Sequence, residues 1–213
     1  MRKVVVIGDG GHGKVIREVI EELHDTELVG ILDDKFVNLH VENNLYKGPS
    51  SAAIELFQAL PDVQFILGVG ANTVRKQLFE RLGLPLESYT ILVHPSAVIS
   101  KSAQIQNGTV VMAASVVQAD THIGAHSIIN TGVIVEHDNQ IGDYVHLSPG
   151  TVLTGGVKVK ASAHVGAGTV VIPGKTIGCR SITGAGATVI NDIPDDTTAV
   201  GIPARIIKNS IKG

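Results

Sequence analysis

The sequence predicts two domains of different texture: a small α/β domain with a Rossmann-like order of elements, then an all-β parallel β-helix. Three observations carry this prediction. An aliphatic residue recurs at every sixth position from Ile99 to Val189, short apolar runs alternate with helical patterns before residue 94, and a glycine-rich turn follows the first run. We therefore expect an α/β domain over residues 1–93, a β-helix over 94–192 and a capping tail over 193–213.

The period of six defines the second domain. A helix repeats its apolar face at spacings of three and four and a half-buried strand at two, so this period fits neither. It is typical of a solenoid in which each hexad is a short strand plus a corner, which here gives about five coils of three strands. The inward positions are Ile99, Ile105, Val111, Val117, Ile123, Ile129, Val135, Ile141, Leu147, Leu153, Val159, Val165, Val171, Ile177, Thr183 and Val189, of which only Thr183 is not aliphatic.

The first 93 residues alternate between strand and helix signals, which indicates a parallel α/β unit. We expect strands over 4–7, 28–32, 65–67 and 91–93, and helices over 15–23, 54–60 and 73–82, with Gly83 as a helix stop. Residues 41–50 give little signal and are expected to form a loop. The tail beyond the last hexad is expected to cover the exposed end of the solenoid, because an uncovered coil presents unpaired strand edges.

Composition narrows the function classes. The chain has 213 residues, a net charge of −3 and 17% charged residues, so no basic surface for nucleic acid is expected. It contains no apolar run long enough to insert into a membrane and no secretory signal pattern. Cys179 is the only cysteine, which excludes an internal disulfide and fits a reducing compartment. We expect a cytoplasmic location.

A glycine-rich turn, Gly8-Asp9-Gly10-Gly11-His12-Gly13, lies between the first strand and the first helix, and Asp33-Asp34 follow about twenty residues later. Taken alone, the pattern matches a dinucleotide-binding turn. Physically it requires only that backbone N–H groups at a helix N-terminus hold a phosphate while an acid accepts hydrogen bonds. A nucleotide sugar fits that description as well as NAD does, and a structural tight turn remains a third interpretation.

Among the histidines of the solenoid, His137 is distinguished by its flanking carboxylates, Glu136 and Asp138. A neighbouring carboxylate orients an imidazole and raises its basicity, which suits a general base. The alternative is a solvated polar corner. Since positions eighteen apart stack, His146 should lie in one column with His164. His137 and His146 are half a coil apart, so if both serve one site they must come from neighbouring subunits.

Two further sets of solenoid residues are candidates. Asn130 should lie near the same corner as His137 and could donate to the substrate or to a developing oxyanion, although a structural amide is an equal alternative. Ala167 and Ala185 are eighteen apart and flanked by glycines, so they should stack and leave a groove of exposed backbone. Simple tight corners would give the same pattern.

These motifs together resemble the NeuD/PglD-type sugar acetyltransferases. The resemblance rests on Gly10-Gly11-His12-Gly13-Lys14, on Asp33-Asp34, on Gly68-Val69-Gly70-Ala71-Asn72 and on Glu136-His137-Asp138 within the hexads, and it covers essentially the whole chain. It implies a left-handed β-helix, a homotrimer, and transfer of acetyl from acetyl-CoA to the amino group of a nucleotide-linked sugar of the UDP-4-amino-4,6-dideoxyhexose type, for bacterial surface or exopolysaccharide synthesis.

The resemblance also implies roles for individual residues. His137 would be the catalytic base, Asp138 the acid that tunes it, and Asn130 a further catalytic candidate. The sugar nucleotide would contact Gly10, Gly11, His12, Asp33, Asp34 and Gly70. Acetyl-CoA, the co-substrate, would contact His146, Ala167 and Ala185, and no metal is expected. Gly10 stands where a relative can carry serine, so one hydroxyl contact to the substrate is in doubt.

Other functions fit less well. A zinc-dependent solenoid of the γ-class carbonic anhydrase type needs histidines five apart, and no pair here has that spacing. A covalent acyl-enzyme on Cys179 would lack a neighbouring histidine. An NAD-binding or non-catalytic nucleotide-binding protein would keep the glycine turn but would not need the Glu136-His137-Asp138 triplet. O-acetylation of sialic acid or another sugar remains the main alternative within the transferase reading.

Overall fold

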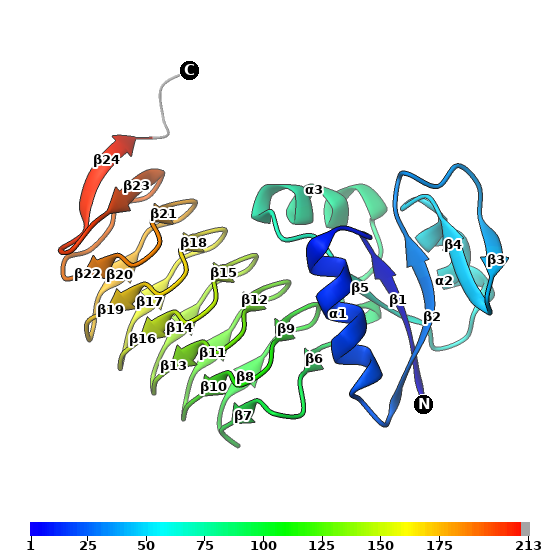
Figure 1. The fold of residues 1–213 in the computed structure, drawn as a ribbon, viewed down its shortest axis with the longest axis horizontal. Helices are drawn as coiled ribbons and strands as arrows, with labels where there is room; N and C mark the ends of the chain where they lie inside the picture. Colours follow the sequence, from blue (N-terminus) through cyan, green and yellow to red (C-terminus); the bar gives the residue numbers. More distant parts are fainter. Residues whose placement is uncertain (210–213) are drawn as a thin grey trace.

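The structure is a computed structural model that describes residues 1–209. Its N-terminal part is a five-stranded sheet in the order β3-β4-β2-β1-β5, flanked by three helices (Figure 1). The strands β4, β2, β1 and β5 are mutually parallel, and β3 is antiparallel to β4. The elements are β1 (Arg2–Ile7), α1 (Gly11–Glu21), β2 (Thr26–Leu32), β3 (His40–Glu42), β4 (Leu45–Gly48), α2 (Ala52–Ala59), β5 (Gln64–Leu67) and α3 (Asn72–Leu82), followed by a 3-10 turn (Leu86–Ser88).

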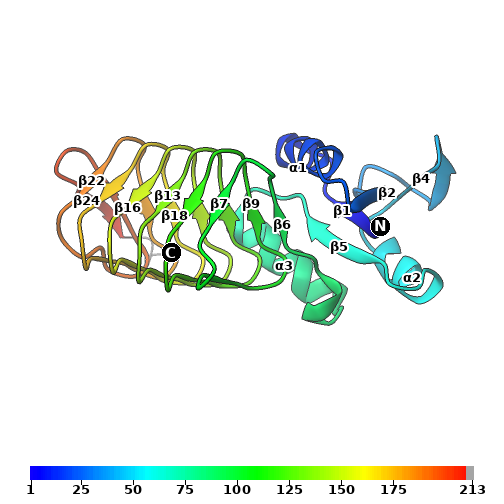
Figure 2. The same ribbon diagram turned by 90° about the horizontal axis from the view of Figure 1, so that it is seen from below.

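Alternation along β1 places two apolar layers on opposite faces of this sheet. Val4 and Val6 pack with α1 and with Leu92 and Val110 of the solenoid. Val5 and Ile7 face the other way and join a core with α2 and α3. Figure 2 shows α1 and α3 on opposite sides of the sheet. The N-terminal domain therefore shares part of its core with the β-helix.

The rest of the described chain forms three parallel sheets of short strands, as the period of six predicts. The covered sheet contains β6 (Leu92–Val93), β9 (Val110–Val111), β12 (Ile128–Ile129), β15 (His146–Leu147), β18 (His164–Val165), β21 (Ile182–Thr183), β23 (Thr197–Val200) and β24 (Arg205–Asn209). The apolar sheet contains β7 (Val98–Ile99), β10 (Val116–Val117), β13 (Ile134–Val135), β16 (Val152–Leu153), β19 (Val170–Val171) and β22 (Thr188–Val189). The polar sheet contains β8 (Gln104–Ile105), β11 (His122–Ile123), β14 (Gln140–Ile141), β17 (Lys158–Val159) and β20 (Thr176–Ile177).

The second residue of each of these two-residue strands points into the core, and the hexad side chains from Val111 to Val189 are buried. Thr183, the one polar member, is also buried. Its hydroxyl accepts a hydrogen bond from Gly166 N at 3.1 Å and contacts Thr169 Oγ1 at 3.2 Å. This polar residue is therefore satisfied inside an aliphatic column.

Three edges separate the sheets. The first edge joins the covered and apolar sheets, the second joins the apolar and polar sheets, and the third joins the polar and covered sheets. Helix α3 contacts the third edge, where Asn72 Nδ2 donates to Ser162 O and Ala163 O. Helix α1 lies beside Ala113 and Thr131 of the first edge, across a small cavity. The N-terminal domain thus lies over the covered sheet, and the second edge is opposite to it.

The structure differs from two expectations, the start of the β-helix and the loop over residues 41–50. Leu92 and Val93 pair with Val110 and Val111, so the first strand of the β-helix lies before the expected boundary at residue 94. Residues 41–50 are not a loop: β3 and β4 form a hairpin around Asn43 and Asn44, whose φ values of 51° and 62° suit a tight two-residue turn. In the tail, β23 continues the covered sheet and β24 pairs antiparallel to β23, while residues 210–213 lie outside the described part. No helix in residues 1–209 is long and apolar enough to cross a membrane.

Candidate functional site

The glycine-rich turn brings the ends of β1 and β5 into direct contact. A Cβ on Gly13 would lie 2.1 Å from the Gly8 carbonyl oxygen, and one on Gly68 would lie 2.7 Å from the same atom. Gly8 itself has a φ of 113°, which disfavours any residue with a side chain. Gly10 and Gly11, at the start of α1, are exposed, with no described atom within 4 Å of an added Cβ. Their backbone N–H groups are therefore open to a ligand.

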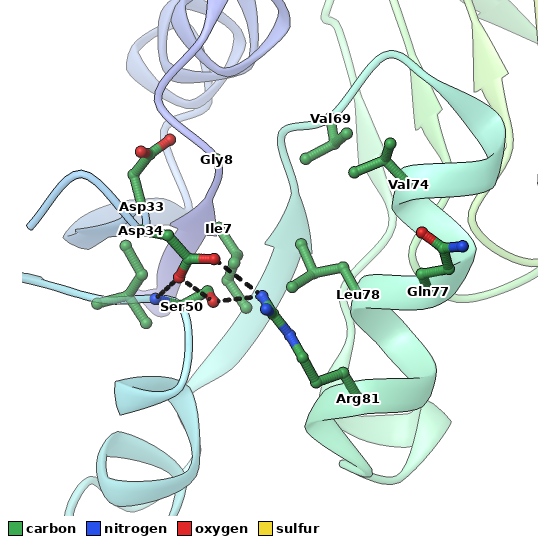
Figure 3. A pocket seen from close by; sticks show the side chains of 11 residues that line it. Ile7, Gly8, Asp33, Asp34, Ser50, Val69, Val74, Gln77, Leu78 and Arg81 are labelled. Atoms are coloured by element: carbon green, nitrogen blue, oxygen red, sulfur yellow. Dashed lines mark hydrogen bonds and ion pairs between the residues drawn. The ribbon is translucent and has the colours of Figure 1, made fainter.

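Next to this turn is a cavity of about 390 Å³ at the carboxyl ends of β1 and β2 (Figure 3). Its apolar wall comes from these strands and from α3, and its polar groups include Asp33, Asp34, Ser50 and Arg81. A crevice at the strand ends of an open parallel sheet is where such folds bind ligands. The volume and the mixed lining suit part of a nucleotide.

Asp34 is held by two neighbours. Its Oδ1 accepts hydrogen bonds from Ser50 N at 2.9 Å and from Ser50 Oγ, and Arg81 lies 3.1 Å from its Oδ2. The hydrogen bonds from Ser50, with a smaller contribution from Arg81, lower the pKa of the Asp34 carboxyl. Asp33 accepts from Asp9 N at 2.8 Å and from Lys35 N at 3.0 Å. Both acids predicted as substrate contacts thus line the cavity as preorganised acceptors.

The other predicted substrate residues lie toward the β-helix. His12 is largely buried, and its Cβ is 3.9 Å from the place where a Cβ on Gly70 would stand. The rings of His12 and His146 have their centroids 6.5 Å apart, and the rings of His146 and His164 are 4.8 Å apart. Burial lowers the pKa of His12 to about 4. One predicted substrate residue and one predicted acetyl-CoA residue therefore lie close together at the domain junction of a single chain.

Hydrogen bonds assign the tautomer of His146. Asn130 Oδ1 accepts from Thr131 N at 2.8 Å, so the Asn130 amide nitrogen is the atom that faces Nε2 of His146, at 3.1 Å. Nε2 is then an acceptor, and the ring proton resides on Nδ1, which is buried and has no hydrogen-bond partner among the described residues. Burial, followed by the neighbouring His164, lowers the pKa of His146 to about 3. His146 is therefore a neutral imidazole that cannot gain a proton at ordinary pH.

Arg75 of α3 holds this junction together and was not anticipated. It is 1% exposed and donates to His126 O at 2.7 Å, Val69 O at 2.9 Å, Gly70 O at 3.0 Å and Tyr144 O at 3.1 Å. No carboxylate among residues 1–209 is paired with it, and burial lowers its pKa to about 10. The sequence does contain an indication that Arg75 is buried. Two polar residues, Asn72 and Arg75, share one helical face with Leu78 and Leu82.

His137 lies in a contrasting environment, on the second edge between β13 and β14. Its side chain is 62% exposed, and Nδ1 lies 2.7 Å from Oδ2 of Asp138. The hydrogen bond to Asp138 raises the pKa of His137. The corner beneath it is rigid, because the buried Asn139 side chain donates to Thr154 O at 3.0 Å and Thr121 Oγ1 donates to Glu136 O at 2.9 Å. The result is an exposed, oriented and basic imidazole.

Asn130 and His137 do not share a corner. Asn130 follows β12 at the first edge, whereas His137 follows β13 at the second edge, so the expected proximity of these residues is wrong. The reason is that seven residues carry the chain through one whole strand and into the next corner. Asn130 instead accompanies His146, and its predicted catalytic role stays a prediction.

Two of the three predicted acetyl-CoA residues lie along the first edge, whereas His146 lies on the adjoining covered sheet. Ala167 and Ala185 are exposed corner residues stacked one coil apart, since Gly186 N donates to Ala167 O at 2.7 Å. The same column continues through Pro149 to Thr131, which adjoins Asn130 and hence His146. Within residues 1–209, no group of three or more His, Cys, Asp or Glu side chains could hold a metal ion.

Comparison with known proteins agrees with this arrangement. Residues 3–82 match the PglD N-terminal domain, and residues 88–187 match the GMPPB C-terminal domain. Perosamine N-acetyltransferase from Caulobacter crescentus, in complex with CoA and GDP-perosamine, superposes with a TM-score of 0.87 at 35% identity and 97% coverage of both chains. The acetyltransferase domain of PglB from Neisseria gonorrhoeae gives a TM-score of 0.86 at 35% identity, covering 97% of this chain and all of that one.

This chain belongs to the PglD/NeuD-type sugar acetyltransferases. The matches confirm the predicted fold of the family, an α/β domain followed by a left-handed parallel β-helix. In sequence, a Bacillus subtilis UDP-N-acetylbacillosamine N-acetyltransferase is 56% identical over 113 residues, which are 53% of this chain and 52% of that protein. The chain therefore matches about half the length of this curated relative.

Proposed function

We propose that the chain transfers acetyl from acetyl-CoA to the amino group of a nucleotide-linked 4-amino-4,6-dideoxyhexose, for bacterial surface glycan synthesis. The observation that carries the proposal is the exposed His137, oriented by Asp138 at 2.7 Å, on a protein that also has a nucleotide-sized cavity. The names of the relatives support the acceptor class, because they act on UDP-linked and GDP-linked amino sugars. We place the enzyme in the cytoplasm, because its single cysteine, Cys179, fits a reducing compartment.

The proposed chemistry is direct transfer in a ternary complex. Asp138 keeps the His137 proton on Nδ1, which leaves the Nε2 lone pair free. The sugar amine attacks the thioester carbonyl carbon and gives a proton to Nε2. The tetrahedral intermediate then collapses, the carbon–sulfur bond breaks, and the CoA sulfur leaves and takes up the proton. Stacked Ala167 and Ala185 leave the first edge open for the pantetheine arm.

His137 and the cavity at Asp33 and Asp34 belong to opposite sides of one chain, so we propose that a homotrimer completes the site. The apolar sheet supplies a surface for this assembly. Its outward residues are Val98, Val116, Ile134, Val152, Val170 and Thr188, whereas those of the polar sheet are Gln104, His122, Gln140, Lys158 and Thr176. Val98 is 61% exposed and Val170 is 38% exposed in the single chain. Packing this face on a second copy would bring His137 of the partner subunit toward the sugar-nucleotide cavity.

The acceptor is tested with a panel of UDP-, GDP- and dTDP-linked 4-amino-4,6-dideoxyhexoses and with sialic acid, by measuring CoA release from acetyl-CoA. We expect turnover with at least one nucleotide amino sugar and none with sialic acid. Mass spectrometry of the product distinguishes an N-acetyl from an O-acetyl group. Turnover confined to sialic acid or to a hydroxyl acceptor would overturn the proposed substrate class.

The assembly is tested with Val170→Lys, which buries an ammonium in the proposed interface. We expect wild type to elute as a trimer in size-exclusion chromatography with light scattering, and the variant to be monomeric and inactive with an unchanged circular dichroism spectrum. Lys158→Glu, on the exposed polar sheet, is the matched control and should remain trimeric. A fully active monomer would contradict the shared site.

A further inference from the structure

One coil after His137, the corner carries a glycine that leaves space for the imidazole. The two corners are stacked, because Gly156 N donates to His137 O at 2.9 Å. A Cβ on Gly155 would lie 2.6 Å from Cε1 and 2.7 Å from Nε2 of His137. Carbon atoms that are not bonded stay well beyond such distances. The imidazole and a side chain at position 155 cannot both occupy this place.

The backbone itself gives no reason for a glycine here. The left-handed residue of this corner is Gly156, with φ 68°, and Gly155 is not among the residues with positive φ. The same position within the hexad carries alanine at other corners: at Ala119 of the second edge, at Ala161 of the third edge, and at Ala167 and Ala185 of the first edge. The three nearest atoms to a Cβ on Gly155 all belong to the His137 ring. Only the imidazole therefore competes for this space.

We propose that Gly155 is a positioning residue for the acetyl transfer, because its bare backbone lets the His137 ring lie flat across the corner with Nε2 at a set place. The inference rests on the proposed role of His137 as base. Two features then define the place of the ring: Asp138 holds Nδ1 at 2.7 Å, and the missing Cβ of Gly155 leaves room for the Cε1–Nε2 edge. A methyl group at position 155 forces the ring to swing away, which displaces the basic nitrogen and disturbs the contact with Asp138.

The test is Gly155→Ala in the full-length protein. We expect kcat/KM to fall about 10- to 100-fold, the scale of effect for a misplacement of about 1 Å at a reacting group. The melting temperature should be equal or higher, because alanine suits this φ and the ring is exposed. The acid limb of the pH–rate profile should move to lower pH as the ring loses Asp138. Wild-type kcat/KM with an unmoved profile would overturn the proposal, and so would a fall in melting temperature of several degrees.

A double-mutant cycle separates positioning from any other effect of the methyl group. In a His137→Ala background the space above Gly155 is empty, so adding Gly155→Ala should leave the residual rate unchanged. Equal losses in both backgrounds would show that Gly155 acts independently of His137. If His137→Ala alone leaves turnover intact, the proposed function of His137 fails. If His137→Ala is impaired but Gly155→Ala is not, only the positioning role of Gly155 fails.

Discussion

Two histidine environments of the β-helix differ in almost every physical respect. His137 lies on the second edge, 62% exposed, and its carboxylate partner raises its pKa. His146 lies on the covered sheet between His12 and His164, and burial lowers its pKa to about 3. The first is a solvent-accessible imidazole whose pKa is raised by its carboxylate partner, whereas the second is held as a neutral hydrogen-bonding group.

The contrast shows that the pKa of a histidine depends on where in the solenoid it lies. Arg75, buried at the domain junction, adds a positive charge that disfavours protonation of His12, His126, His146 and His164. No such charge is paired with His137, which instead faces Asp138 and Glu136. The buried histidines are therefore held neutral, and the exposed one is accessible for proton transfer.

The largest expected effect comes from removing the exposed imidazole. His137→Ala should lower kcat/KM by about 10²- to 10⁴-fold, the usual contribution of a general base, with the fold retained. Steady-state CoA release measures the loss. His122→Ala is the matched control, because His122 is also an exposed histidine of the solenoid but lies on the polar sheet, in β11, and its turnover should equal that of wild type. Equal activities of the two variants would show that His137 is not the general base.

A smaller effect is expected when only the carboxylate is changed. Asp138→Asn keeps a residue that tolerates the φ of 60° at this corner but removes the charge that raises the pKa of His137. We expect kcat/KM at neutral pH to fall about 10-fold, since the amide no longer holds the ring proton on Nδ1. Because the base is active when neutral, a lower pKa moves the acid limb of the profile to lower pH.

The direct measurement is an NMR titration of the His137 ring in both proteins. The titration midpoint should be lower in Asp138→Asn than in wild type. An unchanged midpoint would show that Asp138 does not set the basicity of His137, and the raised pKa would need another source.

The features around exposed His137 can be predicted from the sequence more completely than those around buried His146. The hexads alone predicted the inward column, the stacking of His146 on His164 and the exposed Glu136-His137-Asp138 corner, because these depend only on spacing within a regular solenoid. The glycine turn and the cavity acids were also recognisable, because Gly8 and Gly13 meet within a local strand–turn–helix unit. Local geometry and strict periodicity are the parts of a fold that residue patterns specify directly.

What could not be predicted depends on how the two domains dock. Arg75 reaches the carbonyls of His126 and Tyr144, which lie more than fifty residues away in the chain, and nothing in its helix identifies those partners. The contact of His12 with His146 arises in the same way. The expected position of Asn130 beside His137 is wrong because seven residues, although close in sequence, carry the chain along a whole strand to the next edge of the coil. The strand Leu92–Val93 lies at the domain boundary, where it could pair with the α/β sheet or with the solenoid, and the sequence does not show that it pairs with Val110 and Val111 of the solenoid.

The smallest expected effect tests the buried environment by its pH dependence. The folded-state pKa values of His12, His126 and His146 are about 4, about 4 and about 3, all below the ordinary value of 6.5. The unfolded chain therefore binds more protons at mildly acid pH. The free energy of unfolding is therefore highest above about pH 6.5 and falls as pH falls toward 4. It falls by about 1.4 kcal/mol per pH unit for each extra proton that the unfolded chain binds.

Urea denaturation at several pH values between 7 and 4.5 measures this slope. In His146→Gln, an amide keeps a hydrogen-bonding group beside Asn130 but cannot titrate, so the slope should decrease by about one proton relative to wild type. The exposed His137 behaves in the opposite sense, since its raised pKa gives a stabilisation that is fully present below about pH 6.5 and is lost as pH rises above it, so His137→Ala should leave the slope between pH 6.5 and 4.5 unchanged. If both variants change the slope in the same direction, the two histidine environments do not differ as the structure indicates.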